Sequence, residues 1–113
     1  LAQGFLTGKY TREDGLTGES TASDSDRWAE QYLTAENFET LDVVQAVAEE
    51  VDATPAQVAL AYHRHHPDIT APLVGARTVS QLEENLRAAT ISLSDDQFDR
   101  LDGAKAGPFE RFL

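Results

Sequence analysis

The chain has 113 residues, of which 41% are hydrophobic and 26% charged, a composition typical of a globular protein rather than a disordered one. Its formal net charge of -11 argues against binding to nucleic acid or to an anionic membrane surface, since both require basic patches. The chain has no cysteine, which excludes disulfides, thiolate metal sites and cysteine nucleophiles.

The sequence also bears on source and location. Among nine basic residues, only Lys9 and Lys105 are lysines. A high-salt cytoplasm favours such an acidic, lysine-poor surface, so a halophilic source is one explanation and GC-rich coding is the other. No apolar run approaches the ~20 residues of a membrane-spanning helix, and no targeting pattern opens the chain, so we expect a cytoplasmic protein. Because the chain starts at Leu1 and contains no methionine, we expect it to be part of a longer protein.

The first half of the chain predicts a strand end, a loop and helices. Residues 1–6 fit the tail of a buried strand, and residues 7–26 predict a long polar loop. Helical spacing follows from Asp26, with Trp28, Tyr32 and Leu33 near one another on one face. Residues 36–51 predict an amphipathic helix whose apolar stripe consists of Phe38, Leu41, Val44, Ala48 and Val51.

Three capping boxes organise the second half. Thr54 and Gln57 begin a helix that is apolar nearly all round as far as Tyr62, so we expect it to be packed on two sides. Residues 71–74 (APLV) predict a strand that runs through Gly75 into a helix capped by Thr78 and Gln81, with Leu82 and Leu86 facing inward. After an extended link at residues 91–93, Ser94 and Gln97 begin a helix that buries Phe98 and Leu101, followed by a tail at residues 108–113.

This alternation of strands and helices predicts an α/β architecture with parallel strands, although the chain itself is mostly helical. Two strands cannot form a closed sheet, and such apolar helices need a larger surface to cover. The chain therefore looks incomplete and would supply about two strands of an eight-stranded (β/α)8 barrel, a fold of typically about 250 residues.

The turn at residues 75–78 is a candidate phosphate site. A helix N-terminus presents unpaired N–H groups and the positive end of its dipole, and the Arg77 guanidinium could hold a phosphate through two hydrogen bonds. An ordinary strand-to-helix turn with a surface arginine is the alternative.

No catalytic or metal-binding constellation is predicted. His63 and His66 have the i, i+3 spacing of paired metal ligands but no evident third ligand, so the HRHH cluster is interpreted as a polar helix terminus and no metal is expected. The adjacent acidic pairs point to different sides of their helices and form no acid–base pair.

Two segments together, LAQGFLTGKY at residues 1–10 and TPAQVALAYHRHHPDITAPLVGARTVSQLEENLRAATISLSDDQFDRLD at residues 54–102, resemble the aldo-keto reductase superfamily. The resemblance is strongest to its bacterial, archaeal and potassium-channel β-subunit-like branches. It implies a (β/α)8 barrel that binds NADP(H), with residues 1–6 after the seventh strand and residues 71–74 as the eighth. Residues 1–113 would be a partial domain without its N-terminal two-thirds.

The resemblance also implies a cofactor site and no catalytic residue in this chain, because the family's catalytic tetrad comes from earlier strands. Many members carry a basic residue where this chain has Gln81, which bears on the choice between NADPH and NADH. The implied cofactor-binding residues are Leu1, Ala2, Gln3 and Lys9 around the pyrophosphate, Gly75, Ala76 and Arg77 around the adenosine phosphate, and Gln81, Glu84 and Asn85 around the 2′-phosphate and adenine.

Three functions follow as hypotheses. The first is the cofactor-binding part of an NADPH-dependent oxidoreductase that reduces small aldehydes and ketones to alcohols, the chain alone being inactive. The second is a cofactor-sensing regulatory protein like the potassium-channel β-subunits. The third is a non-enzymatic acidic helical interaction module. None involves nucleic acid or a membrane, and the sequence leaves the oligomeric state open.

Overall fold

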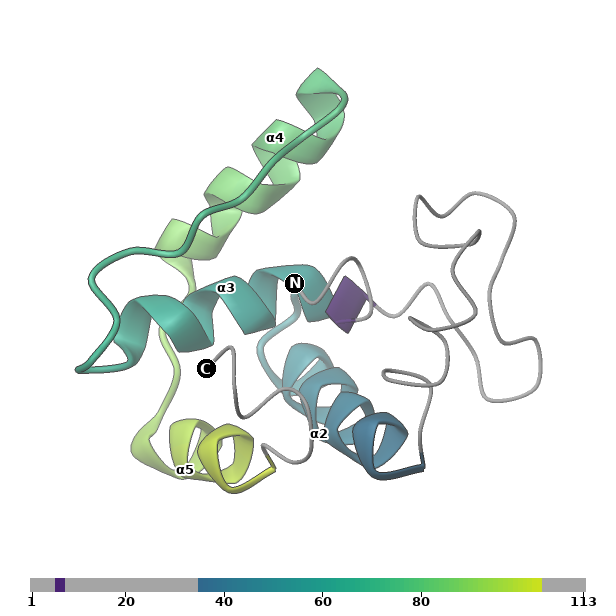
Figure 1. The fold of residues 1–113 in the computed structure, drawn as a ribbon, viewed down its shortest axis with the longest axis vertical. Helices are drawn as coiled ribbons and strands as arrows, with labels where there is room; N and C mark the ends of the chain where they lie inside the picture. Colours follow the sequence, from purple (N-terminus) through teal and green to yellow (C-terminus); the bar gives the residue numbers. More distant parts are fainter. Residues whose placement is uncertain (1–5, 8–34, 105–113) are drawn as a thin grey trace.

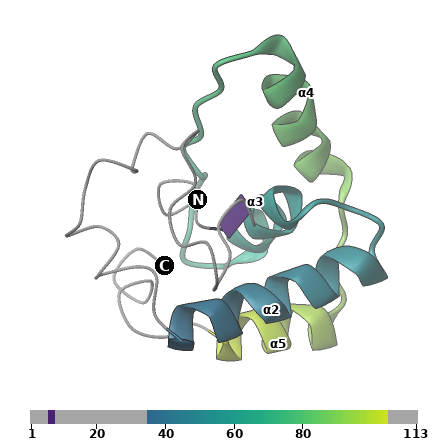
Figure 2. The ribbon, with the colours of Figure 1, turned by 90° about the vertical axis from the view of Figure 1, so that its right-hand side faces the viewer.

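The structure, a computed structural model, describes residues 6–7 and 35–104. The predictions for residues 1–5, for the loop and helix at residues 8–34 and for the tail at residues 108–113 lie outside the described residues. The helices of the described part are α2 (Ala35–Glu50), α3 (Pro55–His65), α4 (Val79–Arg87), the short 3-10 helix η2 (Ala88–Thr90) and α5 (Asp95–Gly103). Helices α2 and α5 run side by side, α3 lies across them, and α4 extends away from the other three (Figure 1, Figure 2).

Helix α2 confirms the predicted amphipathic stripe. Phe38, Leu41, Val44 and Ala48 are buried, and Val47 between them is fully buried. The helix ends where Asp52 adopts a positive φ of 54°. The N–H of Ala53 bonds back to the carbonyl of Ala48 and that of Asp52 to the carbonyl of Glu49, so the last turn closes as a Schellman motif.

Helix α3 begins at its predicted capping box and forms the centre of the core. The Thr54 hydroxyl accepts the N–H of Gln57, while the Gln57 side chain accepts the N–H of Thr54. Pro55 occupies the first helical position, where the missing N–H costs nothing. Every residue from 56 to 62 is buried, as a helix packed on two sides requires.

Helix α5 also begins at its predicted capping box, Ser94 and Gln97. Its buried Leu101 joins the core and its partly buried Phe98 packs against it. The rings of Phe98 and Tyr62 stack with centroids 5.2 Å apart, and the Tyr62 hydroxyl donates to Asp102 at 2.6 Å. The ring stack and the hydrogen bond therefore fasten α5 beneath α3.

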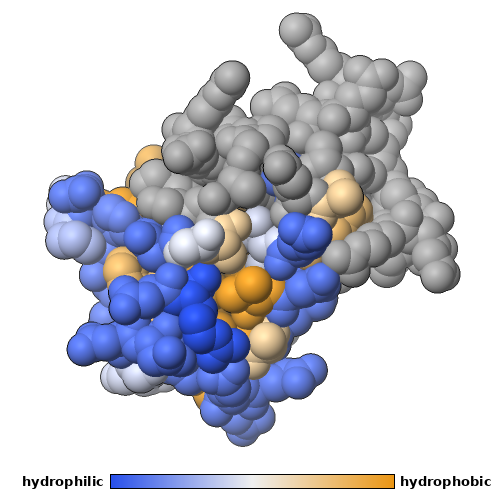
Figure 3. Space-filling model, turned by 90° about the horizontal axis from the view of Figure 1, so that it is seen from below, coloured by the Kyte–Doolittle hydropathy of each residue, from blue (hydrophilic) through white to orange (hydrophobic). Residues whose placement is uncertain are grey.

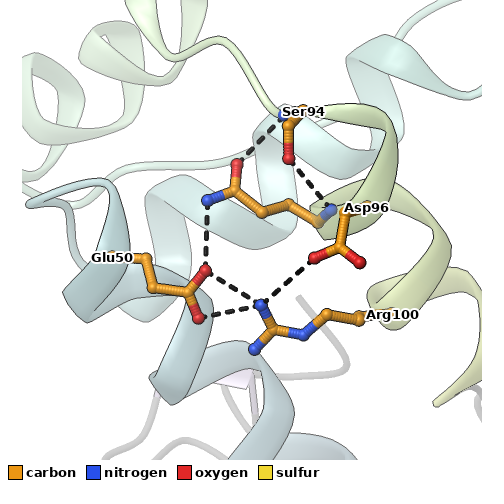
Figure 4. Close-up of polar contacts among 5 residues, drawn as sticks. Glu50, Ser94, Asp96 and Arg100 are labelled. Atoms are coloured by element: carbon orange, nitrogen blue, oxygen red, sulfur yellow. Dashed lines mark hydrogen bonds and ion pairs between the residues drawn. The ribbon is translucent and has the colours of Figure 1, made fainter.

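On the surface, a polar cluster joins the end of α2 to α5. Seen from below, the described surface is largely hydrophilic with a small apolar area (Figure 3). Arg100 pairs with the Glu50 carboxylate at 2.8 Å, and the Gln97 amide donates to the same carboxylate (Figure 4). The hydrogen bond from Arg100, followed by that from Gln97, holds the pKa of the Glu50 carboxyl below its ordinary value.

The stretch before α4 departs from the prediction. Residues 71–76 form no strand, and Leu73 is 98% exposed. A parallel strand needs a neighbouring strand to pair with, and the described residues supply none. The prediction that Leu82 and Leu86 face inward is also wrong, because these side chains are 46% and 64% exposed. Their spacing gives α4 an apolar face, but the described residues do not cover it.

None of the helices in the described part of the chain is long and apolar enough to cross a membrane.

Candidate functional site

The candidate phosphate site is the turn that leads into α4. Thr78 caps the helix from an extended conformation, and its hydroxyl accepts the N–H of Gln81 at 3.1 Å, as predicted. The other half of the capping box differs, because the Gln81 side-chain oxygen accepts the N–H of Arg77, one residue earlier, at 2.8 Å. This bond extends the cap backwards and ties the turn at Arg77 to the first turn of α4.

The start of α4 has the features that an anion requires. Gly75, Ala76 and Arg77 are exposed, and Arg77 forms no ion pair with any described residue. The N–H groups of the first helical turn have no carbonyl partner within the helix, and the helix dipole is positive at this end. A Cβ on Gly75 would meet no atom within 4 Å, so the described chain leaves open space there.

Glu84 and Asn85 lie further along α4 and are partly buried. Glu84 faces a hollow of about 490 Å³ between α4 and the turn that begins α3. Three carboxylates and one guanidinium line this hollow, which leaves a formal excess of two negative charges and does not suit a phosphate. The turn at Arg77 lies outside it. The lining residues are Asp52, Ala53, Thr54, Gln57, Ser80, Glu83, Glu84 and Arg87.

The structure thus places six of the predicted cofactor-binding residues on one short segment, from Gly75 to Asn85. The remaining four lie outside the described residues, so their part in the cofactor site stays a prediction. They are Leu1, Ala2, Gln3 and Lys9.

The histidines lie at the C-terminal end of α3 and in its cap. His66 caps the helix, and its Nδ1 accepts the N–H of Asp68 at 3.1 Å while its Nε2 lies 3.9 Å from Asp102. The Nε2 of His63 is buried and has no hydrogen-bond partner among the described residues. Burial lowers the pKa of the His63 imidazole. In the described part of the chain, no three histidine, aspartate or glutamate side chains gather as a metal-ligand set.

Tyr62 has the environment of a structural tyrosine. Burial, followed by the hydrogen bond to Asp102, raises the pKa of its hydroxyl above the ordinary value. The hydroxyl already donates to that carboxylate, so it is poorly placed to give a proton to a substrate.

Sequence reasoning identified Gln57 as a helix cap and missed its second contact. Its side-chain nitrogen donates to the backbone carbonyl of Glu84 at 2.9 Å, which links α3 to the candidate site. Arg64 makes a similar contact with the carbonyl of Ile91 at 2.7 Å, beyond the end of α4. The capping box was a sign that the Gln57 side chain is fixed, but nothing local indicated that α4 would be its partner.

Comparison with known proteins assigns the family. The model of the aldo/keto reductase family matches residues 1–106. An uncharacterized oxidoreductase of Mycobacterium tuberculosis is 40% identical over 111 residues, covering 94% of this chain and 32% of that protein. A putative voltage-gated potassium channel subunit beta of Schizosaccharomyces pombe is 36% identical over 92 residues, covering 78% of this chain and 26% of that protein. The NADP(+) aldo-keto reductase yakc of the same yeast is 30% identical over 95 residues, covering 84% of this chain and 28% of that protein.

The chain spans less than a third of the length of each of these relatives. The family match extends over nearly the whole chain and includes the turn at residues 75–77, α4 and α5. The oxidoreductase and aldo-keto reductase names among the relatives agree with the resemblance seen in the sequence. The chain belongs to the aldo/keto reductase family.

Proposed function

We propose that this chain supplies the cofactor-binding C-terminal part of a (β/α)8-barrel oxidoreductase that uses NADPH to reduce small aldehydes and ketones to alcohols. The family supports an oxidoreductase, and the relative named for NADP(+) supports this cofactor. The observation that carries the proposal is the start of α4, where the exposed Arg77 stands beside a capped helix N-terminus.

The residues of this segment fit the adenosine end of the cofactor. Arg77 and the first-turn N–H groups of α4 other than that of Gln81, which the Thr78 hydroxyl accepts, would hold the 2′-phosphate. The Gln81 oxygen already accepts a backbone N–H, so its amide nitrogen is the part left to donate to a ligand. Glu84 and Asn85 provide an acceptor and a mixed donor and acceptor for the adenine edge. The preceding turn at Gly75 and Ala76 leaves room for the nucleotide to approach the backbone.

The pyrophosphate would be held by the start of the chain, at Leu1, Ala2, Gln3 and Lys9. The cofactor supplies the hydride when it is bound, and the role proposed for residues 1–113 is to bind and orient it. No residue of this chain is assigned a proton-transfer role.

The test is cofactor binding and turnover by the full-length protein. NADPH titration followed by tryptophan and nicotinamide fluorescence should show saturable binding, and aldehydes or ketones should then oxidise the bound NADPH. Absence of binding to both NADPH and NADH would contradict the proposal and favour an acidic interaction module.

A second function is favoured by the potassium-channel-subunit-like relative. In this alternative the protein binds the cofactor as a sensor and regulates a partner. Tight NADPH binding with negligible turnover across a broad carbonyl panel would support it over the reductase.

A further inference from the structure

The buried amide of Gln57 is shared between two helices. Gln57 lies in the first turn of α3 and is 7% exposed. Its oxygen accepts the N–H of Thr54 at 3.1 Å, which closes the capping box, and its nitrogen donates to the carbonyl of Glu84 at 2.9 Å. One end of the amide therefore starts α3, and the other end holds the backbone of α4.

The acceptor on α4 is a carbonyl that does not receive its regular α-helical hydrogen bond. In an uninterrupted α-helix the carbonyl of Glu84 would accept the N–H of Ala88. That N–H bonds instead to the carbonyls of Asn85 and Leu86, where α4 tightens into η2. The Gln57 amide therefore donates to a carbonyl near the end of α4 that has lost its regular α-helical donor.

Helix α4 has few other ties to the helices beneath it. None of its own residues is buried, and the nearest buried side chain is Ala88 in η2. Arg64 anchors the chain further on, at the carbonyl of Ile91. In the described part of the chain, the bond from Gln57 is the hydrogen bond that joins α4 itself to another helix.

We infer that Gln57 is a positioning residue for the cofactor site, which it serves by fixing α4 along its length through the Glu84 carbonyl. This inference rests on the proposed function, which places Glu84 and Asn85 at the adenine end of the cofactor. Since NADPH and NADH share the adenine, loss of the Gln57 bond should weaken the binding of both cofactors. Loss of Arg77 should instead weaken NADPH selectively.

The sharpest variant is Gln57→Glu in the full-length protein. A carboxylate can still accept the N–H of Thr54 and so keep the cap, but it cannot donate to the Glu84 carbonyl and repels it. The matched control is Gln97→Glu, the same substitution at the same position of the capping box that begins α5. The Gln97 side chain donates to the Glu50 carboxylate on α2 and accepts the N–H of Ser94, and neither bond involves α4. Gln57→Met, which removes both bonds, is the second variant.

Two readouts separate positioning from general stability. The first is hydrogen exchange of the amides at residues 82–88, which should become about tenfold faster in Gln57→Glu and remain unchanged in Gln97→Glu. The second is the Kd for NADPH and for NADH, measured well below the melting temperature. Both affinities should weaken, by about three- to tenfold, in Gln57→Glu and in Gln57→Met.

Protonation of the carboxyl introduced by Gln57→Glu restores a donor to the Glu84 carbonyl. The loss of affinity in that variant should therefore shrink as the pH is lowered, whereas the loss in Gln57→Met should shrink far less. A merely structural role would not produce this difference between the two variants.

Unchanged exchange at residues 82–88 in both Gln57 variants would overturn the inference, and so would faster exchange with both affinities unchanged. If the unsubstituted protein binds neither cofactor, the proposed function fails, and the cofactor role of Gln57 fails with it. The exchange data distinguish that failure, because they report the bond to Glu84 whether or not a cofactor binds.

Discussion

The apolar face of α4 should contribute little to the stability of residues 1–113 prepared as a separate polypeptide. Leu86 is 64% exposed, whereas Leu41 in the core is 2% exposed. Full burial of a leucine side chain is worth about 1.5–3 kcal/mol, so the covered third of Leu86 accounts for about 0.5–1 kcal/mol. Leu86→Ala should cost no more than that, while Leu41→Ala should cost about 2–5 kcal/mol because it also leaves a cavity.

Urea unfolding followed by far-ultraviolet circular dichroism compares the two variants, which carry the same chemical change. The unsubstituted polypeptide should also bind a dye that reports exposed apolar surface, and Leu86→Ala should lower that signal. A loss of more than about 2 kcal/mol in Leu86→Ala would show that this face is covered within residues 1–113. Absence of dye binding to the unsubstituted polypeptide would contradict the exposure of this apolar face.

Three further predictions concern the helices around α3, with stability measured on the full-length protein by denaturant or thermal unfolding. Tyr62→Phe keeps the ring stack and removes the hydrogen bond to Asp102, so it should lower the free energy of unfolding by about 1.5 kcal/mol. An unchanged free energy of unfolding would show that this hydrogen bond contributes nothing to stability. Asp52→Gly should stabilise by about 0.5–1 kcal/mol because glycine adopts positive φ without strain, and a loss of stability would mean that the Asp52 side chain matters more than its backbone. Burial lowers the folded-state pKa of His63, so its contribution to stability should be complete above the unfolded pKa of about 6.5 and should be lost as the pH falls below that value. His63→Phe should flatten this loss of stability at low pH, and an unaltered pH profile of stability would exclude His63 as the cause.

The sequence predicted the parts of the fold whose signals are local. The capping boxes at Thr54 and Ser94 place two helix starts correctly because both partners of each hydrogen bond lie within one turn. The stripe on α2 is correct because a helix with one apolar face has a single way to bury it, and Val47 completes that face. The signal at Thr78 was also local, yet Gln81 bonds to Arg77, one residue outside the box.

The features that the sequence could not provide depend on distant partners. Periodicity shows that α4 has an apolar face but cannot show what covers it, so the exposure of Leu82 and Leu86 was not foreseen. An apolar run such as residues 71–74 becomes a strand only beside another strand. At the candidate site, the motif identified Arg77 and the start of α4, whereas the bond from Gln57 to Glu84 joins residues 27 apart and is visible only in the folded chain.

The most direct test of the cofactor assignment is the ratio of NADPH to NADH affinity in Arg77→Ala. Arg77 is exposed at the start of α4 in a chain of formal charge -11, so it should supply much of the local attraction for the 2′-phosphate. The substitution should weaken NADPH binding by about 1.5–3 kcal/mol and NADH binding far less, since NADH lacks that phosphate. His63→Phe should leave both affinities unchanged. Equal losses for the two cofactors in Arg77→Ala would contradict the account, because Arg77 would then hold the pyrophosphate or the fold and not the 2′-phosphate.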